Sequence, residues 1–537
     1  MKTLNRKRCC QATRCKEQLQ MRRPLRNNLL QAKARSMSVT KLKSISLQSS
    51  QFIFAALVLL ICTRVSAAVL YVDANSANPI PPYTNWATAA AVIQDAVDLA
   101  NTGDTVLVTN GIYSTGGRQL VPYDITNRVA VTNGAIIQSV SGPSVTFIRG
   151  YQVPTFASIT NAVRCVYLAN NAVLSGFTLT NGSAGMGNNV NGGGAVCAGA
   201  GGKSPGGVIS NCVFIGNVAI GGAGGGTAGG NLFNCLLIGN YGQGGGAAWG
   251  ATLVNCTVTN NTAGWAGAIL DCAATNCLFA FNHATNYGGS SGFSTFVNCT
   301  VVSNSLQAGL GGNGGGSYHD VVYNSIVYGN TAPNGPNYSS SAMTYCCTTP
   351  LVSGAGNFTN PPLFVDPSAG DFRMQSNSPC INAGRNAYVT TTTDLAGNPR
   401  ISAGTVDIGA YEFQNPASII AYYWLQNFGL PTDGSADFAD PDQDGQSTWS
   451  EWRSGTVPTN ALSALKVAAP SRDSSGITVT WQSVSGMSYY VQRATNLSAS
   501  SAFSSIQSNI GGQAGTTSYK DTSATGTGPY FYRVGVQ

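Results

Sequence analysis

Residues 440–451, DPDQDGQSTWSE, place acidic side chains at the first, third, fifth and twelfth positions of a twelve-residue stretch. This is the spacing of a loop that wraps oxygen atoms around Ca²⁺, with glycine at the sixth position to allow a sharp turn. The spacing therefore predicts Ca²⁺ as a cofactor, and the alternative is an acidic loop that holds no metal. The expected ligands are Asp440, Asp442, Asp444, Gln446 (backbone carbonyl), Thr448 (hydroxyl or a water) and Glu451 (both carboxylate oxygens).

Two tryptophans are candidates for a different kind of recognition. Trp249 and Trp265 each follow a glycine-rich run, 16 residues apart. Aromatic rings that are exposed on a protein surface stack on sugar rings, so both residues are candidates for glycan stacking. The alternative, packing over neighbouring loops, is the more common fate of a tryptophan side chain.

Side chains for acid–base catalysis are scarce. Glycoside hydrolysis needs a pair of carboxyl groups, and a lyase needs a base beside acids that hold a metal. Between residues 150 and 345 the acids are Asp271 and Asp320, which we expect to be solvated turn or loop residues. The more numerous acids of residues 346–413 are expected to form an ion-paired capping structure with Arg373 and Arg400. No residue is therefore assigned a catalytic role.

A repeat runs through the middle of the chain. An Asn-Cys pair recurs at 211, 234, 255, 276 and 298, a variant Asn-Ser pair follows at 324, and the spacings are 23, 21, 21, 22 and 26 residues. Repeats of this length are typical of solenoids, and the apolar residues after each pair alternate as in a strand with one face inward. Glycine-rich runs between the copies supply tight corners. The pattern predicts a right-handed parallel β-helix with one strand, a corner, a second short strand and a loop per coil.

Two columns of side chains would stack along such a helix. Stacked coils lie about 4.8 Å apart, which does not suit disulfide geometry. We therefore expect buried thiols in the first column, with disulfides as the alternative that an oxidising compartment would favour. The amides of the second column are expected to form a hydrogen-bonded ladder that satisfies the turns rather than a ligand site. The columns are Cys212, Cys235, Cys256, Cys277 and Cys299, and Asn217, Asn240, Asn261, Asn282, Asn304 and Asn330.

The coils resemble the right-handed β-helix repeats of the pectate-lyase-like superfamily, and the flanking segments extend the resemblance. Residues 86–101 resemble its N-terminal capping helix, with Ile93, Val97 and Ala100 on one face. Residues 346–413 resemble the choice-of-anchor Q family, which implies a secreted or surface-exposed bacterial protein. The motifs that carry this second resemblance are NPPLFVDP, GDFR, SPCINAG, DLAGNPR and VDIGAYEF.

The two C-terminal regions resemble modules of exported proteins. The acidic loop lies between a helix expected at 418–429 and a short helix expected at 449–455. This arrangement resembles the dockerin-like or thrombospondin-like calcium modules with an EF-hand loop, which implies a structural clasp. Residues 462–537 alternate apolar and polar residues and resemble a fibronectin type III-like sandwich, through Trp481 and the late segment YFYRV.

The N-terminal residues are typical of a leader for export. Residues 52–62 form an apolar run of signal-peptide length, too short for a comfortable membrane span, and Val-Ser-Ala follows at 65–67. The basic stretch before the run is long for such a leader, which favours an over-extended start with Met37 as the alternative. Residues 1–64 hold 14 of the 28 basic residues, so the remainder has 14 basic and 20 acidic residues and no support for nucleic-acid binding. We expect no membrane span after cleavage.

The sequence as a whole predicts an all-β chain. Its expected parts are a leader (1–67), a right-handed parallel β-helix with a cap helix and a choice-of-anchor Q-like segment (68–415, the segment at 346–413), an EF-hand-like calcium module (416–461), and a fibronectin type III-like β-sandwich (462–537). We expect a secreted or cell-surface monomer, adhesin-like and non-catalytic, whose partner is a polysaccharide or cell-surface glycan. The alternatives are a polysaccharide lyase or glycoside hydrolase of the pectate-lyase-like superfamily, and a structural envelope or matrix protein.

Overall fold

The structure is a computed structural model that describes residues 67–120, 125–153, 161–184, 192–198, 206–307, 312–498 and 502–537. The leader expected at 1–67 lies outside the described residues, apart from Ala67.

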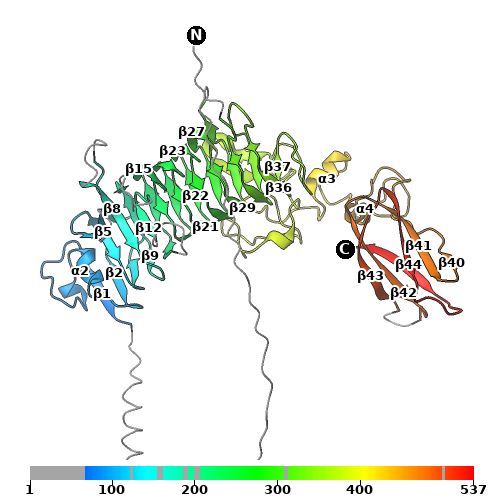
Figure 1. The fold of residues 1–537 in the computed structure, drawn as a ribbon, viewed down its shortest axis with the longest axis horizontal. Helices are drawn as coiled ribbons and strands as arrows, with labels where there is room; N and C mark the ends of the chain where they lie inside the picture. The colour runs from blue at the N-terminus through cyan, green and yellow to red at the C-terminus, as the bar shows by residue number, and fades with distance from the viewer. Residues whose placement is uncertain are drawn as a thin grey trace, which may run out of the picture. The chain divides into compact units, whose positions relative to one another are not determined.

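The chain from Val69 to Thr348 winds into a right-handed parallel β-helix, so the predicted fold class is confirmed (Figure 1). Each complete coil has four strands, which stack on their equivalents into four sheets; we name the sheets A, B, D and C in the order in which the chain visits them. The prediction of two strands per coil is wrong. The glycine-rich stretches, although poor in strand propensity, are held as strands D and C because the coils on both sides pair with them.

The strands of sheets A and B are short and lie in register with those of the next coil. Sheet A contains β1 (Val69–Val72), β2 (Thr105–Val108), β6 (Ile136–Ser139), β9 (Val173–Ser175), β13 (Val208–Ser210), β17 (Asn231–Phe233), β21 (Thr252–Val254), β25 (Ala273–Thr275), β29 (Thr295–Val297), β33 (Val321–Tyr323) and β36 (Ala342–Thr344). Sheet B contains β3 (Gly111–Tyr113), β7 (Thr146–Arg149), β10 (Thr178–Thr180), β14 (Val213–Ile215), β18 (Leu236–Ile238), β22 (Thr257–Thr259), β26 (Leu278–Ala280), β30 (Thr300–Val302), β34 (Ile326–Tyr328) and β37 (Cys347–Thr348).

Sheets D and C close each coil on the other side. Sheet D contains β11 (Ser183–Ala184), β15 (Val218–Ala223), β19 (Tyr241–Gly244), β23 (Thr262–Trp265), β27 (His283–Tyr287) and β31 (Ser305–Leu306). Sheet C contains β4 (Arg118–Gln119), which is antiparallel to its neighbour, and then β5 (Thr126–Val131), β8 (Val163–Leu168), β12 (Val196–Ala198), β16 (Thr227–Ala228), β20 (Ala248–Trp249), β24 (Ile269–Leu270), β28 (Ser291–Gly292), β32 (Ser317–Tyr318) and β35 (Tyr338–Ser339).

Three of the four corners in a coil are built in the same way. One residue adopts a left-handed backbone conformation, and the residue after it turns its side chain into the core. Between sheets A and B these residues are an asparagine, such as Asn211 with φ 51°, and the buried Cys212. Between sheets B and D they are, for example, Gly216 with φ 59° and the buried Asn217. Asparagine tolerates the left-handed conformation better than most side chains, which explains why it precedes each cysteine.

The cysteines of the coils are free thiols packed inside these corners. Cys256 donates its backbone N–H to Sγ of Cys277 on the next coil at 3.3 Å, and its own Sγ contacts the carbonyl of Leu232 at 3.7 Å. All eleven cysteines of the described residues are free, and Cys346 continues the column beyond Ser325. Burial raises the pKa of the Cys212 and Cys346 thiols to about 12.

A thiol titration tests this arrangement. Because buried thiols with a raised pKa react slowly, we expect native protein from Ala68 to react little with a thiol reagent at pH 8. The same protein unfolded in guanidinium without reductant should titrate close to eleven thiols per chain. A count near zero after unfolding would mean that the cysteines form disulfides.

The start of the β-helix is closed by a helix shorter than predicted. Residues 86–101 contain a 3₁₀ turn at Trp86–Thr88, capped by the side chain of Asn85, and then α2 (Ile93–Val97). The expected apolar face, with Ile93, Val97 and Ala100, does pack into the core of the coils. The helix starts late because Ala90 is held extended by a bridge to Val72.

Residues 349–415 cover the outer face of sheet B at its last coils. Leu278 and Ile326 point outward from sheet B and are buried in one cluster with Phe372 of this segment. The N–H of Gly409 also donates to the carbonyl of Asn324 at 2.9 Å. The elements of the segment are β38 (Phe364–Asp366), β39 (Asp371–Met374) and the 3₁₀ turns Pro367–Ala369 and Asn386–Tyr388.

The C-terminal residues form two short helices and two small antiparallel sheets. The helices are α3 (Tyr422–Asn427), which is shorter than the 418–429 predicted, and α4 (Thr448–Ser454). One sheet contains β40 (Ser471–Asp473), β41 (Gly476–Ser483) and β44 (Gly515–Asp521), and the other contains β43 (Ser504–Gly511), β42 (Ser488–Ala494) and β45 (Phe531–Val536). Trp481, Val479 and Val491 lie in their shared core. In the described part of the chain, no helix has the length and apolar character needed to cross a bilayer.

Candidate functional site

The acidic loop brings three carboxylates together. Asp440, Asp442 and Asp444 each offer an oxygen, and these oxygens lie within 4.8 Å of one another. Gly445 has φ 93° at the sharp turn, and its N–H donates to Oδ2 of Asp440 at 2.9 Å. Among the described residues this is the one group of three or more His, Cys, Asp or Glu side chains with ligand atoms so close together.

The residues of this loop fit a cation. Three buried carboxylate oxygens, Oδ2 of Asp442, Oδ2 of Asp444 and Oε2 of Glu451, accept no hydrogen bond in the described structure. Burial, together with the charges of the three aspartates, raises the pKa of Glu451 to about 7. Buried oxygens without partners and mutually repelling carboxylates are costly unless a positive charge lies between them. The loop is therefore suited to Ca²⁺, which prefers such oxygen ligands.

Two other expected ligands have additional contacts. The Thr448 hydroxyl donates to the carbonyl of Ala439 at 3.1 Å, so it is already engaged at the start of α4. Gln446, expected to use its backbone carbonyl, donates its side-chain amide to the carbonyl of Leu465 at 3.1 Å. The loop is thus tied directly to the residue that leads into the sandwich.

The two candidate tryptophans occupy different columns. Trp249 lies at the end of β20 in sheet C, where its register partners are Ala228 and Leu270. Trp265 lies at the end of β23 in sheet D, pairs with Tyr287 of the next coil, and is 53% exposed. Their separation of 16 residues, shorter than the repeat of 21 to 26, was the signal that they are not equivalent.

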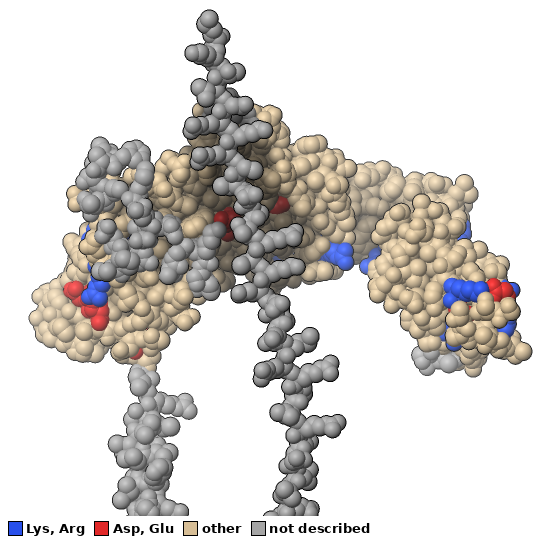
Figure 2. Space-filling view, in the orientation of Figure 1, with Lys and Arg blue, Asp and Glu red and all other residues tan. Residues whose placement is uncertain are grey.

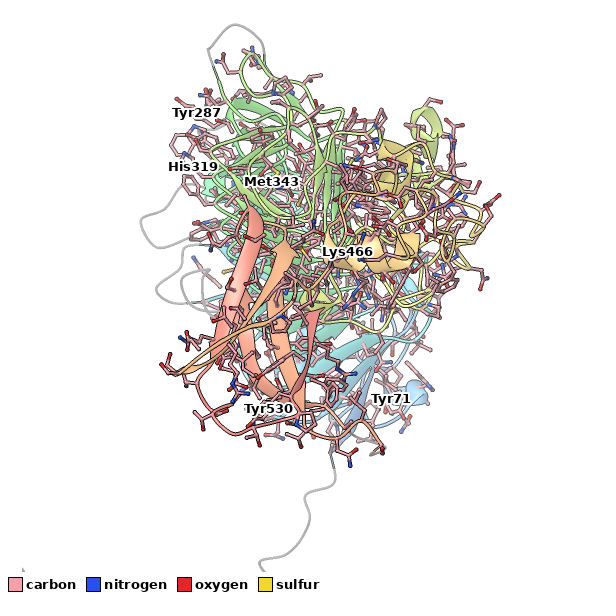
Figure 3. All side chains as sticks on the ribbon, turned by 90° about the vertical axis from the view of Figure 1, so that its right-hand side faces the viewer. Tyr71, Tyr287, His319, Met343, Lys466 and Tyr530 are labelled. Carbon is pink, nitrogen blue, oxygen red and sulfur yellow. The ribbon has the colours of Figure 1, made fainter. Side chains whose placement is uncertain are left out.

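Trp265 belongs to a surface cluster that we name the aromatic corner: Trp265, Tyr287, Phe293, Tyr318 and His319. The rings of Tyr287 and Tyr318 are stacked with centroids 5.3 Å apart, and those of Phe293 and His319 are parallel within 2° at 5.3 Å. Figure 3 labels Tyr287 and His319, which lie on the same side of the coils. Tyr287 is 42% and Phe293 57% exposed, so the corner presents aromatic faces to solvent. The sequence stage identified only Trp265 among these residues.

Asp320 lies beneath the aromatic corner, and the expectation that it is solvated is wrong. It is buried, and its Oδ2 accepts from the hydroxyls of Ser291 (2.6 Å) and Ser317 (2.7 Å), while Oδ1 accepts from the N–H of Ser294 (2.7 Å). Asp271, in contrast, is exposed in a turn, as expected.

A spacing rule could have located Asp320. Cys272, Ser294, Asp320 and Ser341 each stand five residues before a member of the thiol column or its serine variant. They form a third inward column, in which the side chain of each accepts the N–H of the residue one coil earlier: Cys272 from Ala251, Ser294 from Cys272, Asp320 from Ser294 and Ser341 from Asp320.

Burial of Asp320 gives a pH dependence that can be measured. Desolvation outweighs the hydrogen bonds and raises its pKa from the ordinary value of 3.8 to about 6. Between these pH values the folded protein binds a proton that the unfolded chain has lost, so stability falls as pH rises from about 4 to 6. We expect the free-energy difference between wild type and Asp320→Asn to shift against wild type by about 2 to 3 kcal/mol over this range. Urea unfolding at pH 4 and pH 7 measures it, and a constant difference would contradict the shifted pKa.

The predicted amide column lies in the core, fully buried for most of its length. Asn217, Asn240, Asn261, Asn282 and Asn304 have no exposed surface, and Asn330 is almost as buried. Each of the first five donates its backbone N–H to Oδ1 of the next member at 2.9 to 3.0 Å. No surface of the amides is left for a ligand along these coils.

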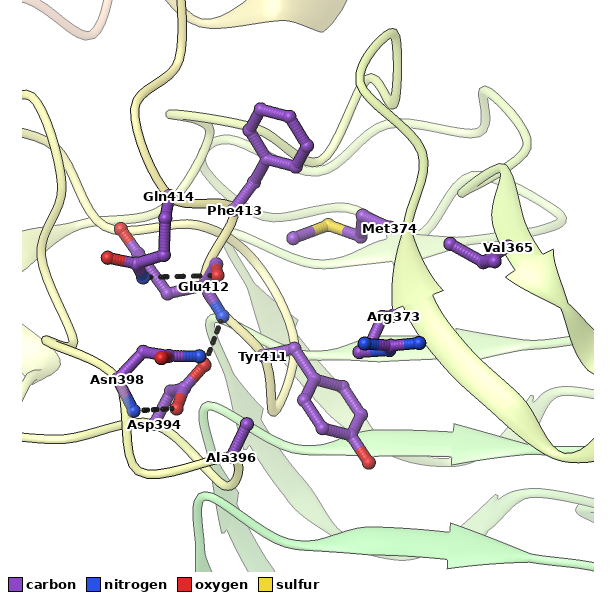
Figure 4. Close-up of a pocket in the computed structure, with 10 residues that line it drawn as sticks. All are labelled: Val365, Arg373, Met374, Asp394, Ala396, Asn398, Tyr411, Glu412, Phe413 and Gln414. Atoms are coloured by element: carbon purple, nitrogen blue, oxygen red, sulfur yellow. Dashed lines mark hydrogen bonds between the residues drawn. The ribbon is translucent and has the colours of Figure 1, made fainter.

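The acids of residues 346–413 serve turns more than ion pairs. A cavity of about 290 Å³ is lined by Asp394, Glu412, Arg373 and Tyr411 among others (Figure 4). All four carboxylate oxygens of Asp394 and Glu412 accept a backbone N–H, at 2.8 to 3.1 Å. Arg373 instead pairs with Asp371 at 2.6 Å on the surface. The cavity therefore holds carboxyl groups that are engaged in the fold.

The buried arginine of the same segment is also used structurally. Arg400 donates from Nη2 to the carbonyls of Asp407 (2.9 Å) and Gly409 (2.8 Å), while the nearest oxygen of Glu412 is 3.9 Å away. The predicted ion pairing is therefore loose for Arg400, and its hydrogen bonds go to the backbone.

Charged side chains are nearly absent from the central coils. The sequence from 204 to 345 has no lysine or arginine, and its acids are Asp271 and Asp320. On the face shown in Figure 2, Lys and Arg are found toward the ends of the described chain rather than along the coils. The aromatic corner is thus surrounded by an almost neutral surface.

Comparisons with known proteins find similarity in fold alone. No family model and no curated protein matches the chain. Among solved structures, it is similar to pectate lyase Pel9A (TM-score 0.37, 13% identity, 66% of this chain and 98% of that one) and to a rhamnogalacturonan lyase (0.34, 12%, 56% and 91%). It is also similar to pectin methylesterase PemA from Erwinia chrysanthemi (0.22, 9%, 54% and 82%). None of these likenesses is close enough to say what this chain does.

Proposed function

We propose that this protein is an exported or surface-attached scaffold that binds a polysaccharide without cleaving it. The observation that carries the proposal is the aromatic corner, whose rings Trp265, Tyr287 and Phe293 are exposed on neighbouring coils. Large exposed aromatic faces are costly in water and are common where sugar rings bind. The position of the protein at or outside the cell surface rests on the leader sequence and on the choice-of-anchor Q-like motifs, and we propose that it acts as a monomer.

The enzyme alternative has less support. In the described coils, Asp271 is exposed and Asp320 is buried two coils away in a different column, so the two carboxyl groups do not converge on one surface. The carboxyl groups beside the 290 Å³ cavity accept backbone hydrogen bonds with every oxygen. Hydrolysis needs two carboxyl groups that face a shared bond, and this geometry favours binding over turnover.

We further propose that Ca²⁺ binds at residues 440–451 in an EF-hand-like module and fixes the start of a fibronectin type III-like sandwich. The side chain of Gln446 bonds to Leu465, and buried Asp437 accepts from the Ser418 hydroxyl (2.6 Å) and the N–H of Ile419 (3.0 Å). The loop is therefore connected to the chain before it and after it. The metal would supply the positive charge that the three aspartates and Glu451 require, and these residues would hold it.

Retention of polysaccharides tests the proposal. Wild-type protein and Trp265→Ala would be compared by affinity electrophoresis in gels that contain soluble polysaccharide. Loss of an aromatic anchor should weaken binding by about fivefold or more. Trp86→Ala is the matched control, because Trp86 is also exposed (43%) but stacks on Tyr71 near the N-terminal cap. Equal retardation of wild type and Trp265→Ala would show that the aromatic corner does not bind the polymer.

A further inference from the structure

Phe293 has a backbone conformation that phenylalanine rarely adopts. It lies at the corner between sheets C and A, in the column Gly229, Gly250, Asp271, Phe293, His319 and Ser340, whose φ angles run from 53° to 74°. Glycine and aspartate accept this left-handed region readily, whereas a bulky side chain is an outlier there. Phe293 is also 57% exposed, so burial of its ring returns little stability for this strain. Strained residues of this kind cluster at functional sites.

One face of the Phe293 ring is covered and the other is not packed in the same way. His319 stands one coil further along the column, and its ring is parallel to that of Phe293 at 5.3 Å, close to the coil spacing of about 4.8 Å. The two rings therefore stack along the helix axis. Tyr318 meets Phe293 edge-on at 5.9 Å and so supports the ring from the side. The remaining face of Phe293 is turned toward the preceding coil, which carries the exposed Asp271.

We propose that this face of Phe293, with the carboxylate of Asp271, forms a subsite for one pyranose residue of a neutral polysaccharide. The inference rests on the proposed glycan-binding function and specifies its site. A pyranose ring has an apolar face of C–H groups, which stacks on an aromatic ring, and hydroxyl groups at its edge. The hydroxyl groups would donate to the carboxylate oxygens of Asp271, since a charged acceptor makes strong hydrogen bonds.

The charges around the subsite select the class of polymer. Asp271 is acidic, and residues 204–345 contain no lysine or arginine that could pair with a uronate. The histidines of these coils are His283, which contacts the Ser305 hydroxyl at 2.9 Å, and His319, which is stacked on Phe293. An acidic polysaccharide would be repelled by Asp271 without compensation, so a neutral chain is favoured.

Phe293→Asn separates binding from folding. Asparagine suits the left-handed conformation, so the variant should be as stable as wild type or slightly more stable, while the aromatic face is lost. We expect at least a tenfold loss of affinity for whichever neutral polymer binds wild type among xyloglucan, mixed-linkage β-glucan and galactomannan. Polygalacturonate serves as the acidic comparison. Phe293→Gly is the second variant, because glycine occupies the same corner at Gly229 and Gly250.

Phe281→Asn is the matched control. Phe281 is likewise left-handed (φ 58°) and 42% exposed, but it lies at the corner between sheets B and D and packs on Phe372. It should bind as wild type does. Unchanged affinity in both Phe293 variants while wild type binds would overturn the subsite and leave the proposed function standing. Absence of any binding by wild type would overturn both, and tighter binding of polygalacturonate than of the neutral polymers would overturn the choice of ligand.

Discussion

Asn261→Ala is expected to lower the free energy of unfolding by about 4 kcal/mol or more. The Oδ1 atom of Asn261 accepts both the backbone N–H and the side-chain amide of Asn240 at 2.9 Å. Its own amide donates to the carbonyl of Leu237 at 2.9 Å and to Oδ1 of Asn282 at 3.0 Å. Alanine would leave several of these buried groups unsatisfied, at roughly 1 to 3 kcal/mol each.

The neighbouring residue provides the control for this variant. Asn260 is exposed, has φ 56° and bonds only to the hydroxyl of Thr259 among the contacts of its side chain. Asn260→Gly keeps the left-handed conformation and should change stability by less than about 0.5 kcal/mol. Urea unfolding followed by circular dichroism compares the two variants. Similar small losses for both would mean that the amide column does not hold the coils together.

Addition of Ca²⁺ is expected to stabilise the protein by about 2.7 kcal/mol when free Ca²⁺ is 100 times the dissociation constant. The gain comes from neutralising Asp440, Asp442, Asp444 and Glu451, three of which have a buried oxygen without a hydrogen-bond partner. Asp444→Ala should abolish the gain. Thermal unfolding with Ca²⁺ or with chelator measures it, and Tb³⁺ luminescence sensitised by Trp449 in α4 reports binding directly.

An acidic residue outside the loop is the control for the metal. Asp433 is exposed and accepts from the Ser435 hydroxyl, so Asp433→Asn should keep the full response to Ca²⁺ and Tb³⁺. If Ca²⁺ stabilises Asp444→Ala as much as wild type, or if Tb³⁺ luminescence is the same in both, the loop is not a metal site.

The repeat was readable from the sequence because its physical cause is local. Each copy needs a residue that accepts a left-handed turn and then a small inward side chain, and Asn followed by Cys meets both needs in two letters. The number of strands per coil was not readable. Strands such as β16 (Thr227–Ala228) are only two residues long and exist because coils on both sides pair with them.

The candidate site was only partly predictable for a related reason. The acidic loop is contiguous, so its spacing identified residues that the structure brings together. The aromatic corner joins residues from sheets D and C and two successive coils, and only the register of the coils places Tyr287 against Tyr318. Asp320 resembled a turn residue because its hydrogen-bond partners, Ser291 and Ser317, become visible only when the coils are stacked.

The most direct test of the account follows binding and turnover in one sample. Protein from Ala68 would be incubated in Ca²⁺ with neutral and acidic polysaccharides, and retained polymer, new reducing ends and unsaturated products would be measured together. The account predicts retention of at least one neutral polymer with no new ends. New reducing ends or unsaturated products on any polymer would contradict a non-catalytic scaffold, and no retention of any polymer would contradict glycan binding.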